Sequence, residues 1–371
     1  TVGSLFGYLE KRVDDNELLV YFMPTSSGPC RFGQYNVLIK NLIHKLQVKN
    51  VAQISLSCEN SYAGLGADFS IRAFQAVIIS DVLEEIYSAV LTIARDKEKA
   101  MKIYNKVCED IIDSVEKDSW QKLKEKLRQA ARSLKAIELL QPLSRTPKVA
   151  LVGEIYVRRD GFSRQYLVEK LAQKGIMVKT APIAEWIYYC DYLIKNNLSA
   201  DTAKKGFIGS FIEQFFKNSY EKSIKEIFSH SGLYEAHRVD VERMIRNVTD
   251  LISPSLTVET ILTVGSAITE VVEEVAGVIS IGPFGCMPSR IAEAVINTKM
   301  NERKIEVARD KELVAKVMQR CPSLPFIAVE TDGNAFPQVI EARLEIFCLQ
   351  VKRIHRRILE NRGRFKAANL I

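Results

Sequence analysis

The sequence lacks the features that identify several common classes of protein. No apolar run approaches the roughly 20 residues that a membrane-spanning helix needs, and no basic-then-apolar segment marks a secretion signal. No two cysteines are spaced as CxxC, and neither GxxxxGK[ST] nor GxGxxG occurs. These absences exclude a local zinc ribbon, a ferredoxin-type loop and the common nucleotide-binding loops. We therefore expect a cytoplasmic protein without membrane association and without ATP hydrolysis of its own.

Histidine is scarce, and the charge is only modestly basic. The 4 histidines show no pair at metal-ligand spacing, so we interpret them as surface or packing residues. The net charge of +7 comes from 52 basic and 45 acidic residues, and the excess gathers in residues 352–357 and 362–366. A run of this kind is typical of a solvated helix face or tail. Without interleaved aromatic residues it predicts no nucleic-acid binding, although an anionic small molecule stays compatible with it.

The remaining composition is that of a globular protein. The chain has 371 residues, of which 47% are apolar and 26% charged, and this length is enough for two domains. Its 7 cysteines are an odd number spread over a long chain, which argues against a secreted disulfide framework and predicts reduced thiols. Any metal site must therefore be assembled by the fold from distant cysteines.

Short apolar segments bounded by proline, glycine or polar turns predict the strands. They lie at residues 17–23, 51–57, 148–154, 176–180, 277–281 and 325–329. Helical periodicity separates them and is longest between about residues 71 and 140. The alternation predicts an α/β protein with two Rossmann-like (flavodoxin-like) three-layer domains, parallel sheets and an additional helical layer.

The break at residues 141–147 suggests the domain boundary. We expect residues 1–146 to form a partial Rossmann-like domain with a helical connector, and residues 147–371 to form a second Rossmann-like domain with a C-terminal helix. The first domain has only two clear strands. Because a two-stranded sheet is hard to stabilise, this domain is expected to lack strands encoded upstream or to borrow them from a partner.

Two cysteines occupy equivalent places, each after a strand and directly before a helix. Cys30 follows the first strand and Cys286 follows the fifth, and glycines flank both. Amide groups and the dipole at a helix N-terminus favour the thiolate, which is the form that binds iron or acts as a nucleophile. Cys30 and Cys286 are therefore candidates for a functional site at the strand ends. The two loops can share one site only if the two domains face each other across a cleft.

The other cysteines favour a structural interpretation. Cys108, Cys190 and Cys348 lie within helical patterns and are expected to be small buried apolar residues. Cys321 precedes a strand, which is the wrong end for the site. Cys58 follows the second strand and is a weaker candidate for a third ligand.

One carboxylate also falls at a strand end. Glu154 follows Gly153 at the end of the third strand, where it could bind substrate or modulate a proton transfer. Two alternatives are equally consistent with the sequence, namely a cap for the next helix or an ion pair with Arg158 or Arg159. The sequence identifies no catalytic residue.

Three segments of the sequence together resemble the 2-hydroxyacyl-CoA dehydratase superfamily. They are residues 28–35 (GPCRFGQY), 152–158 (VGEIYVR) and 283–289 (PFGCMPS), and two shorter segments, 262–265 (LTVG) and 330–333 (ETDG), fit the same pattern. The likeness is greatest to the large CoA-substrate-specific enzyme activases, also described as 2-hydroxyglutaryl-CoA dehydratase activator-like proteins. It covers most of the chain between Cys30 and Phe347.

The resemblance implies an iron–sulphur function. Dehydratase-like subunits of this superfamily hold a [4Fe-4S] cluster with cysteines from Rossmann-like domains, and related members hold a double-cubane cluster. An ATPase module of the actin and sugar-kinase fold supplies a low-potential electron, which passes to a CoA thioester or another substrate that is hard to reduce. Carried over by position, Cys30 and Cys286 correspond to cluster ligands. We thus expect the iron–sulphur component of an ATP-driven electron-transfer system, part of a dehydratase or reductase rather than a complete enzyme.

The sequence also departs from the family pattern. It resembles the C-terminal dehydratase-like portion alone, because the ATPase modules and one cysteine motif of the large proteins correspond to segments upstream of it. The alternatives are a cluster-free fragment and a non-redox α/β module that binds a small molecule. A homodimer is compatible with all of these interpretations.

Overall fold

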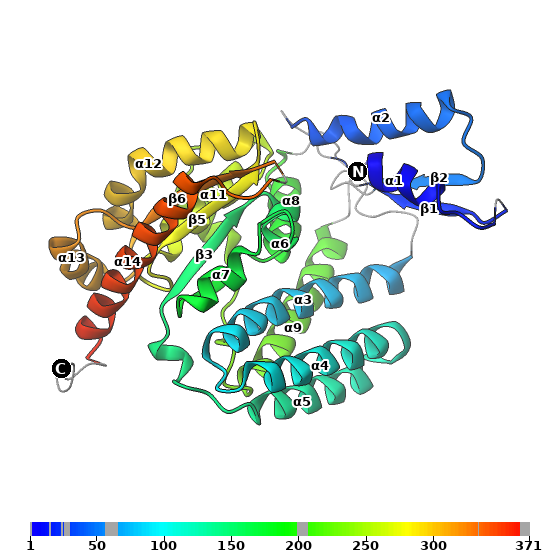
Figure 1. Ribbon diagram of the computed structural model, residues 1–371. Helices are drawn as coiled ribbons and strands as arrows, with labels where there is room; N and C mark the ends of the chain where they lie inside the picture. Colours follow the sequence, from blue (N-terminus) through cyan, green and yellow to red (C-terminus); the bar gives the residue numbers. More distant parts are fainter. Residues whose placement is uncertain are drawn as a thin grey trace.

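The computed structural model describes residues 2–14, 16–23, 25, 30–55, 66–198, 207–332 and 334–363, with only the backbone described for residues 67 and 207–215. It is an α/β protein with two separate parallel sheets, as the sequence predicts (Figure 1). Each of the six expected strands is present. Among the described helices, none combines the length and the apolar character that crossing a bilayer requires.

The N-terminal unit is a strand–helix–strand motif preceded by a short helix. It consists of α1 (Val2–Leu9), β1 (Leu19–Phe22), α2 (Phe32–Lys45) and β2 (Val51–Ile54). The two strands pair in parallel with Leu19 beside Val51. The sequence predicts both strands and α2, whereas α1 is an addition.

The core of this unit is small and separate from the rest. Its buried apolar residues are Leu5, Met23 and Ile39. Val20 and Phe22 on β1 remain 48% and 56% exposed. A sheet of two short strands leaves part of its own apolar face uncovered.

A helical layer follows. It contains α3 (Ala67–Ile93), α4 (Lys97–Lys117) and α5 (Trp120–Lys135), and α9 (Phe207–Ser229) returns from the second half of the chain to contact α3 and α5. These helices and the second sheet share one continuous apolar core.

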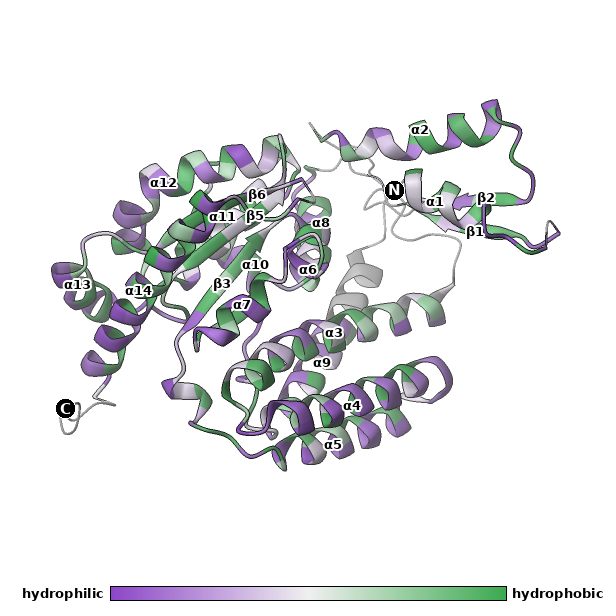
Figure 2. Cartoon of the chain, viewed as in Figure 1, coloured by the Kyte–Doolittle hydropathy of each residue, from purple (hydrophilic) through white to green (hydrophobic). Residues whose placement is uncertain are grey.

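The second sheet has the strand order β4-β3-β5-β6, and all its strands are parallel. Its members are β3 (Lys148–Gly153), β4 (Met177–Thr180), β5 (Val278–Pro283) and β6 (Phe326–Thr331). Both β3 and β4 are buried along their whole length. Figure 2 shows the hydrophobic colouring of β3 and β5, which is typical of parallel strands covered on both faces.

Helices pack against every strand of this sheet. In chain order they are α6 (Ile155–Arg159), α7 (Leu167–Gln173), α8 (Ala184–Lys195), α10 (Val241–Arg246), α11 (Thr260–Glu270), α12 (Met287–Val307), α13 (Lys311–Arg320) and α14 (Gln338–Asn361). Helices α3 and α7 contact β4, α11 contacts β3, and α12 and α14 contact β6. The hydroxyl of Ser88 on α3 also accepts the backbone N–H of Val178 at 2.7 Å, so α3 covers part of the edge strand β4.

Candidate functional site

The strand order places a topological switch point between β3 and β5. The chain leaves β3 toward β4 on one side and leaves β5 toward β6 on the other. Open parallel sheets bind ligands in the crevice outside the carboxyl ends of the two strands at such a point. In Figure 1 the arrowheads of β3, β5 and β6 point toward the side of the molecule on which α2 lies. Cys286, Gly153 and Glu154 therefore belong to the expected binding edge.

Gly153 ends β3 in a conformation that favours glycine. Its φ is +112°, and an added Cβ would overlap the carbonyl oxygen of Ile281 on β5. The next amide, that of Glu154, donates to the same carbonyl at 3.0 Å. A side chain here would separate the two central strands, so Gly153 sets their spacing at the site.

Glu154 serves as the N-cap of α6. Its Oε2 accepts the backbone N–H of Val157 at 2.7 Å. The sequence left three roles open for Glu154, and in the structure it caps the helix. The carboxylate is consequently committed to holding the loop that follows β3.

The loop after β5 carries Cys286 directly before α12. Cys286 is a half-buried reduced thiol, and its side chain makes no capping hydrogen bond. Gly285, with φ +70°, supplies the turn. Gly282 packs so closely on Ser289 that an added Cβ would overlap its hydroxyl. The sulphur atom is thus held at a helix N-terminus and remains available as a ligand.

An ion pair braces this loop from the neighbouring strand. Glu330 on β6 accepts the backbone N–H of Gly285 at 3.2 Å and lies 3.1 Å from Arg290 in the first turn of α12. Arg290 also pairs with Glu293 at 2.5 Å. Glu330 is the first residue of segment 330–333, which is part of the family resemblance. In the structure it positions the loop that carries Cys286.

Cys30 occupies the corresponding place in the N-terminal unit. It lies between β1 and α2, is half-buried and is a reduced thiol. Arg31 is the N-cap residue of α2. Residues 26–29, which complete this loop, and Cys58, the expected weaker ligand, lie outside the described residues. The predicted strand–loop–helix setting of both Cys30 and Cys286 is therefore present, and their shared ligation stays a prediction.

Buried ion pairs fasten the β3 end of the site to α3 and α8. Arg158 lies 2.8 Å from Glu185 and also donates to the carbonyl of Gly153 at 2.8 Å. Asp81 on α3 accepts the amides of Ile183 and Ala184 at 2.8 and 3.0 Å, capping α8. Burial raises the pKa of Glu185, and the charge of Arg158 opposes this shift.

A second arginine completes this attachment. Arg164 is buried, lies 2.6 Å from Glu84 on α3 and donates to the carbonyl of Arg158 at 2.9 Å. Arg159 also pairs with Asp81. Charges buried in this way are costly unless they are paired, so the arrangement fixes the loop after β3 in one geometry.

Sequence reasoning did not single out Glu259, which precedes α11. Burial raises its pKa, the charge of Glu154 adds to the shift, and Arg158 opposes it. Glu259 is therefore within electrostatic range of Glu154 and Arg158, which follow the carboxyl end of β3. No local motif marks it, because the residue reaches this edge only through the path of the chain between β4 and β5.

The remaining described cysteines have structural surroundings. Cys108 and Cys348 lie on α4 and α14, and burial raises the pKa of both thiols, that of Cys348 to about 11. Cys321 is buried at the end of α13, before β6. Cys190 is buried on α8 and is disulfide-bonded, in contrast to the expectation of reduced thiols throughout.

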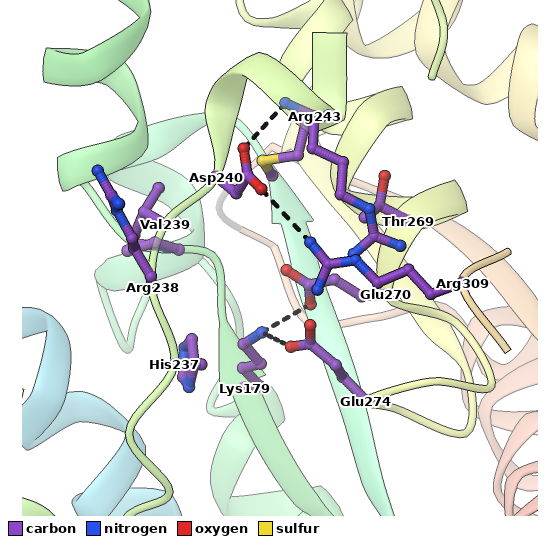
Figure 3. Close-up of a pocket in the computed structure, with 12 residues that line it drawn as sticks. Lys179, His237, Arg238, Val239, Asp240, Arg243, Thr269, Glu270, Glu274 and Arg309 are labelled. Atoms are coloured by element: carbon purple, nitrogen blue, oxygen red, sulfur yellow. Dashed lines mark hydrogen bonds and ion pairs between the residues drawn. The ribbon is translucent and has the colours of Figure 1, made fainter. Parts of the chain in front are cut away.

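A small cavity lies between β4, α10 and α11 (Figure 3). Its volume is about 50 Å³, which is room for a few water molecules at most. Lys179 lies 3.1 Å from Glu270 and 2.6 Å from Glu274. Burial would lower the pKa of Lys179, but the two carboxylates outweigh it and raise the pKa. Because the charges satisfy one another, we interpret this cavity as part of the structural network.

The cysteine thiols at the strand ends are of the chemical type that binds iron–sulphur clusters. Thiolates are the usual ligands of such clusters, and the cysteines Cys30 and Cys286 lie at these strand ends. Within the described part of the chain, no three His, Cys, Asp or Glu side chains are grouped so that they could hold a metal ion. A cluster at these cysteines would need further ligands from elsewhere.

Comparisons of the chain with protein-family models, with curated proteins and with solved structures find no match. The family resemblance therefore depends on the motifs around the two cysteines and on the residues at the strand ends.

Proposed function

We propose that this chain is an iron–sulphur protein that takes part in low-potential electron transfer, as in the 2-hydroxyacyl-CoA dehydratase superfamily. Cys30 and Cys286 are the proposed ligands. The observation that carries the proposal is the setting of Cys286, a half-buried reduced thiol at a helix start beside the switch point of a parallel sheet. Cys30 repeats this setting in the other sheet.

The residues around Cys286 support ligation by holding its loop. Glu330 and Arg290 fix the turn, and Gly153 and Gly282 allow close packing at the ends of β3 and β5. When bound, the cluster supplies a one-electron carrier whose potential depends on hydrogen bonds to sulphur and on solvent exposure. The third and fourth ligands of a [4Fe-4S] cluster would come from a partner or a substrate.

The wider system follows from the resemblance. We expect an ATPase module of the actin and sugar-kinase fold as electron donor and a CoA thioester as the substrate class. A cytoplasmic, anaerobic setting suits ligand thiols that must stay reduced. In this system the chain acts as a component of a dehydratase or reductase.

Anaerobic reconstitution with iron and sulphide tests the proposal. Wild type is compared with Cys30→Ala and Cys286→Ala, and iron content and visible absorption are read. Cys108→Ala is the matched control, because Cys108 is also half-buried and reduced but lies on α4. We expect stoichiometric cluster in wild type and in Cys108→Ala, and its loss in both ligand variants.

Other results would point to the alternatives. Colourless wild type would exclude cluster binding by this chain alone, and repetition with an upstream extension would separate a missing ligand from a wrong function. A cluster that survives both substitutions would exclude Cys30 and Cys286 as ligands. Binding of a CoA ester to colourless protein would favour the non-redox module.

A further inference from the structure

Helix α14 carries apolar residues on the face that points away from the core. Val339, Ile346 and Leu349 are 68%, 57% and 70% exposed, and Ala342 is also exposed. Successive members of this set are three or four residues apart. This is the a/d spacing with which one helix packs along another in a coiled coil. We call these four residues the α14 seam.

The seam is distinct from the surface that holds α14 in the fold. The buried residues of the helix are Leu344, Phe347, Cys348, Val351, Ile354, Ile358 and Leu359. At 100° per residue, the centre of this buried set lies on the opposite side of the helix from the seam. Figure 1 shows α14 at the periphery of the molecule.

The charges on α14 favour one kind of partner. Its first half, residues 338–349, has two glutamates and one arginine. Its second half, residues 350–361, contains Lys352, Arg353, Arg356 and Arg357 against the single Glu360. An identical helix in the parallel direction would bring the two basic halves together. An identical helix in the antiparallel direction brings each basic half against an acidic one and opposes the helix dipoles.

We propose that α14 is the interaction surface for a second copy of this chain, packed antiparallel along the α14 seam. With Ile346 placed against Leu349 of the second copy, two large aliphatic pairs lie around the two-fold axis. Glu345 then comes close to Lys352 of the second copy along the flank of the seam. The interface is isologous, so each favourable pair occurs twice.

The expected dimer is weak. A pair of helices of this length buries less than the roughly 1,600 Å² of a standard interface, so we expect a dissociation constant in the micromolar range. Within one chain, Glu345 already pairs with Lys174, the residue that follows α7, and Glu341 pairs with Lys170 on α7. These pairs are partly exposed, and they contribute little to the free energy of folding.

Sedimentation equilibrium over a range of concentrations tests the dimer. We expect wild type to associate and Ile346→Glu to remain monomeric. Ile112→Glu is the matched control, because Ile112 is 60% exposed on α4, far along the chain from the seam. Thermal melting followed by circular dichroism shows whether each variant is folded. Monomeric wild type at every concentration, or equal association of wild type and folded Ile346→Glu, would overturn the proposal.

A charge exchange tests the direction of packing. Lys352→Glu places a carboxylate near Glu345 of the second copy, and we expect it to weaken association by about tenfold. The double variant Glu345→Lys with Lys352→Glu restores the opposite charges and should recover the wild-type constant. If the double variant associates no better than the single one, the antiparallel register is wrong. Neither measurement depends on a bound cluster, so failure here is separate from failure of the proposed function.

Discussion

Arg158 and Glu185 form a buried ion pair of 2.8 Å that joins α6, directly after β3, to the first turn of α8. Their side chains are only 2% and 3% exposed, and Arg158 also donates to the carbonyls of Gly153 and Pro182. The pair therefore couples the binding edge of the sheet to the helix that follows β4.

We expect Glu185→Ala to lower the free energy of unfolding by about 3–5 kcal/mol, because it leaves the charge of Arg158 buried without its partner. Urea denaturation measures the change. The control is Glu98→Ala, which removes the exposed pair with Lys102 and should cost less than about 1 kcal/mol. Similar losses in the two variants would show that burial adds nothing to the Arg158 pair.

Gly153 and Gly175 both have positive φ, but only Gly153 is crowded. Gly153→Ala combines backbone strain with overlap against Ile281 and should cost about 3–5 kcal/mol. Gly175→Ala meets no atom within 4 Å, so only the strain of its φ remains, about 1 kcal/mol. Equal losses, measured by the same denaturation experiment, would contradict the close approach of β3 and β5.

His237 should make the protein sensitive to mild acid. Burial lowers the pKa of His237 well below its ordinary value, and the charges of Lys179 and Lys225 lower it further. The carboxylate of Glu85, 3.9 Å from Nε2, does not reverse this direction. The unfolded chain therefore binds a proton that the folded protein does not, and stability that is present above about pH 6.5 is lost as the pH falls.

The loss should reach about 1.4 kcal/mol per pH unit for this one group. His237→Gln removes the titration, so the difference between wild type and variant in unfolding free energy should shrink between about pH 7 and pH 5. Glu273 and Glu274, whose pKa values are lowered, act in the same direction but at lower pH. A difference that is independent of pH would show that His237 takes up its proton in the folded state.

The thiols of Cys286 and Cys348 should differ in reactivity. Burial raises the pKa of Cys348 to about 11, so roughly one thiol in a thousand is thiolate at pH 8. Cys286 is half-buried at a helix start. In cluster-free protein, iodoacetamide followed by peptide mass spectrometry should detect modification of Cys286 well before Cys348. Equal rates would mean that α14 opens as readily as the loop after β5.

The sequence predicts the strands well because proline and glycine mark their ends and because parallel strands are continuously apolar. The same proline and glycine residues indicate that Cys30 and Cys286 lie at strand ends. Glu259 could not be found in this way, since it approaches Glu154 through tertiary structure alone. The start of α7 at Leu167 is also hidden from the sequence, because Gln165 and Tyr166 before it adopt positive φ without any glycine to signal it.

The α14 seam was missed for a different reason. Apolar residues occupy both sides of α14, so periodicity alone does not separate the face that packs on the sheet from the outer face. Only burial in the folded protein distinguishes them.

The small core of Leu5, Met23 and Ile39 has a consequence for the behaviour of the N-terminal unit. A unit with so few buried contacts opens at a lower free energy than the continuous core around the second sheet. Amides of β1 and β2 should exchange with deuterium ahead of those of β3 and β5. Any ligand held by Cys30 then contributes its binding free energy to the folding of this unit, so occupancy and local order rise together.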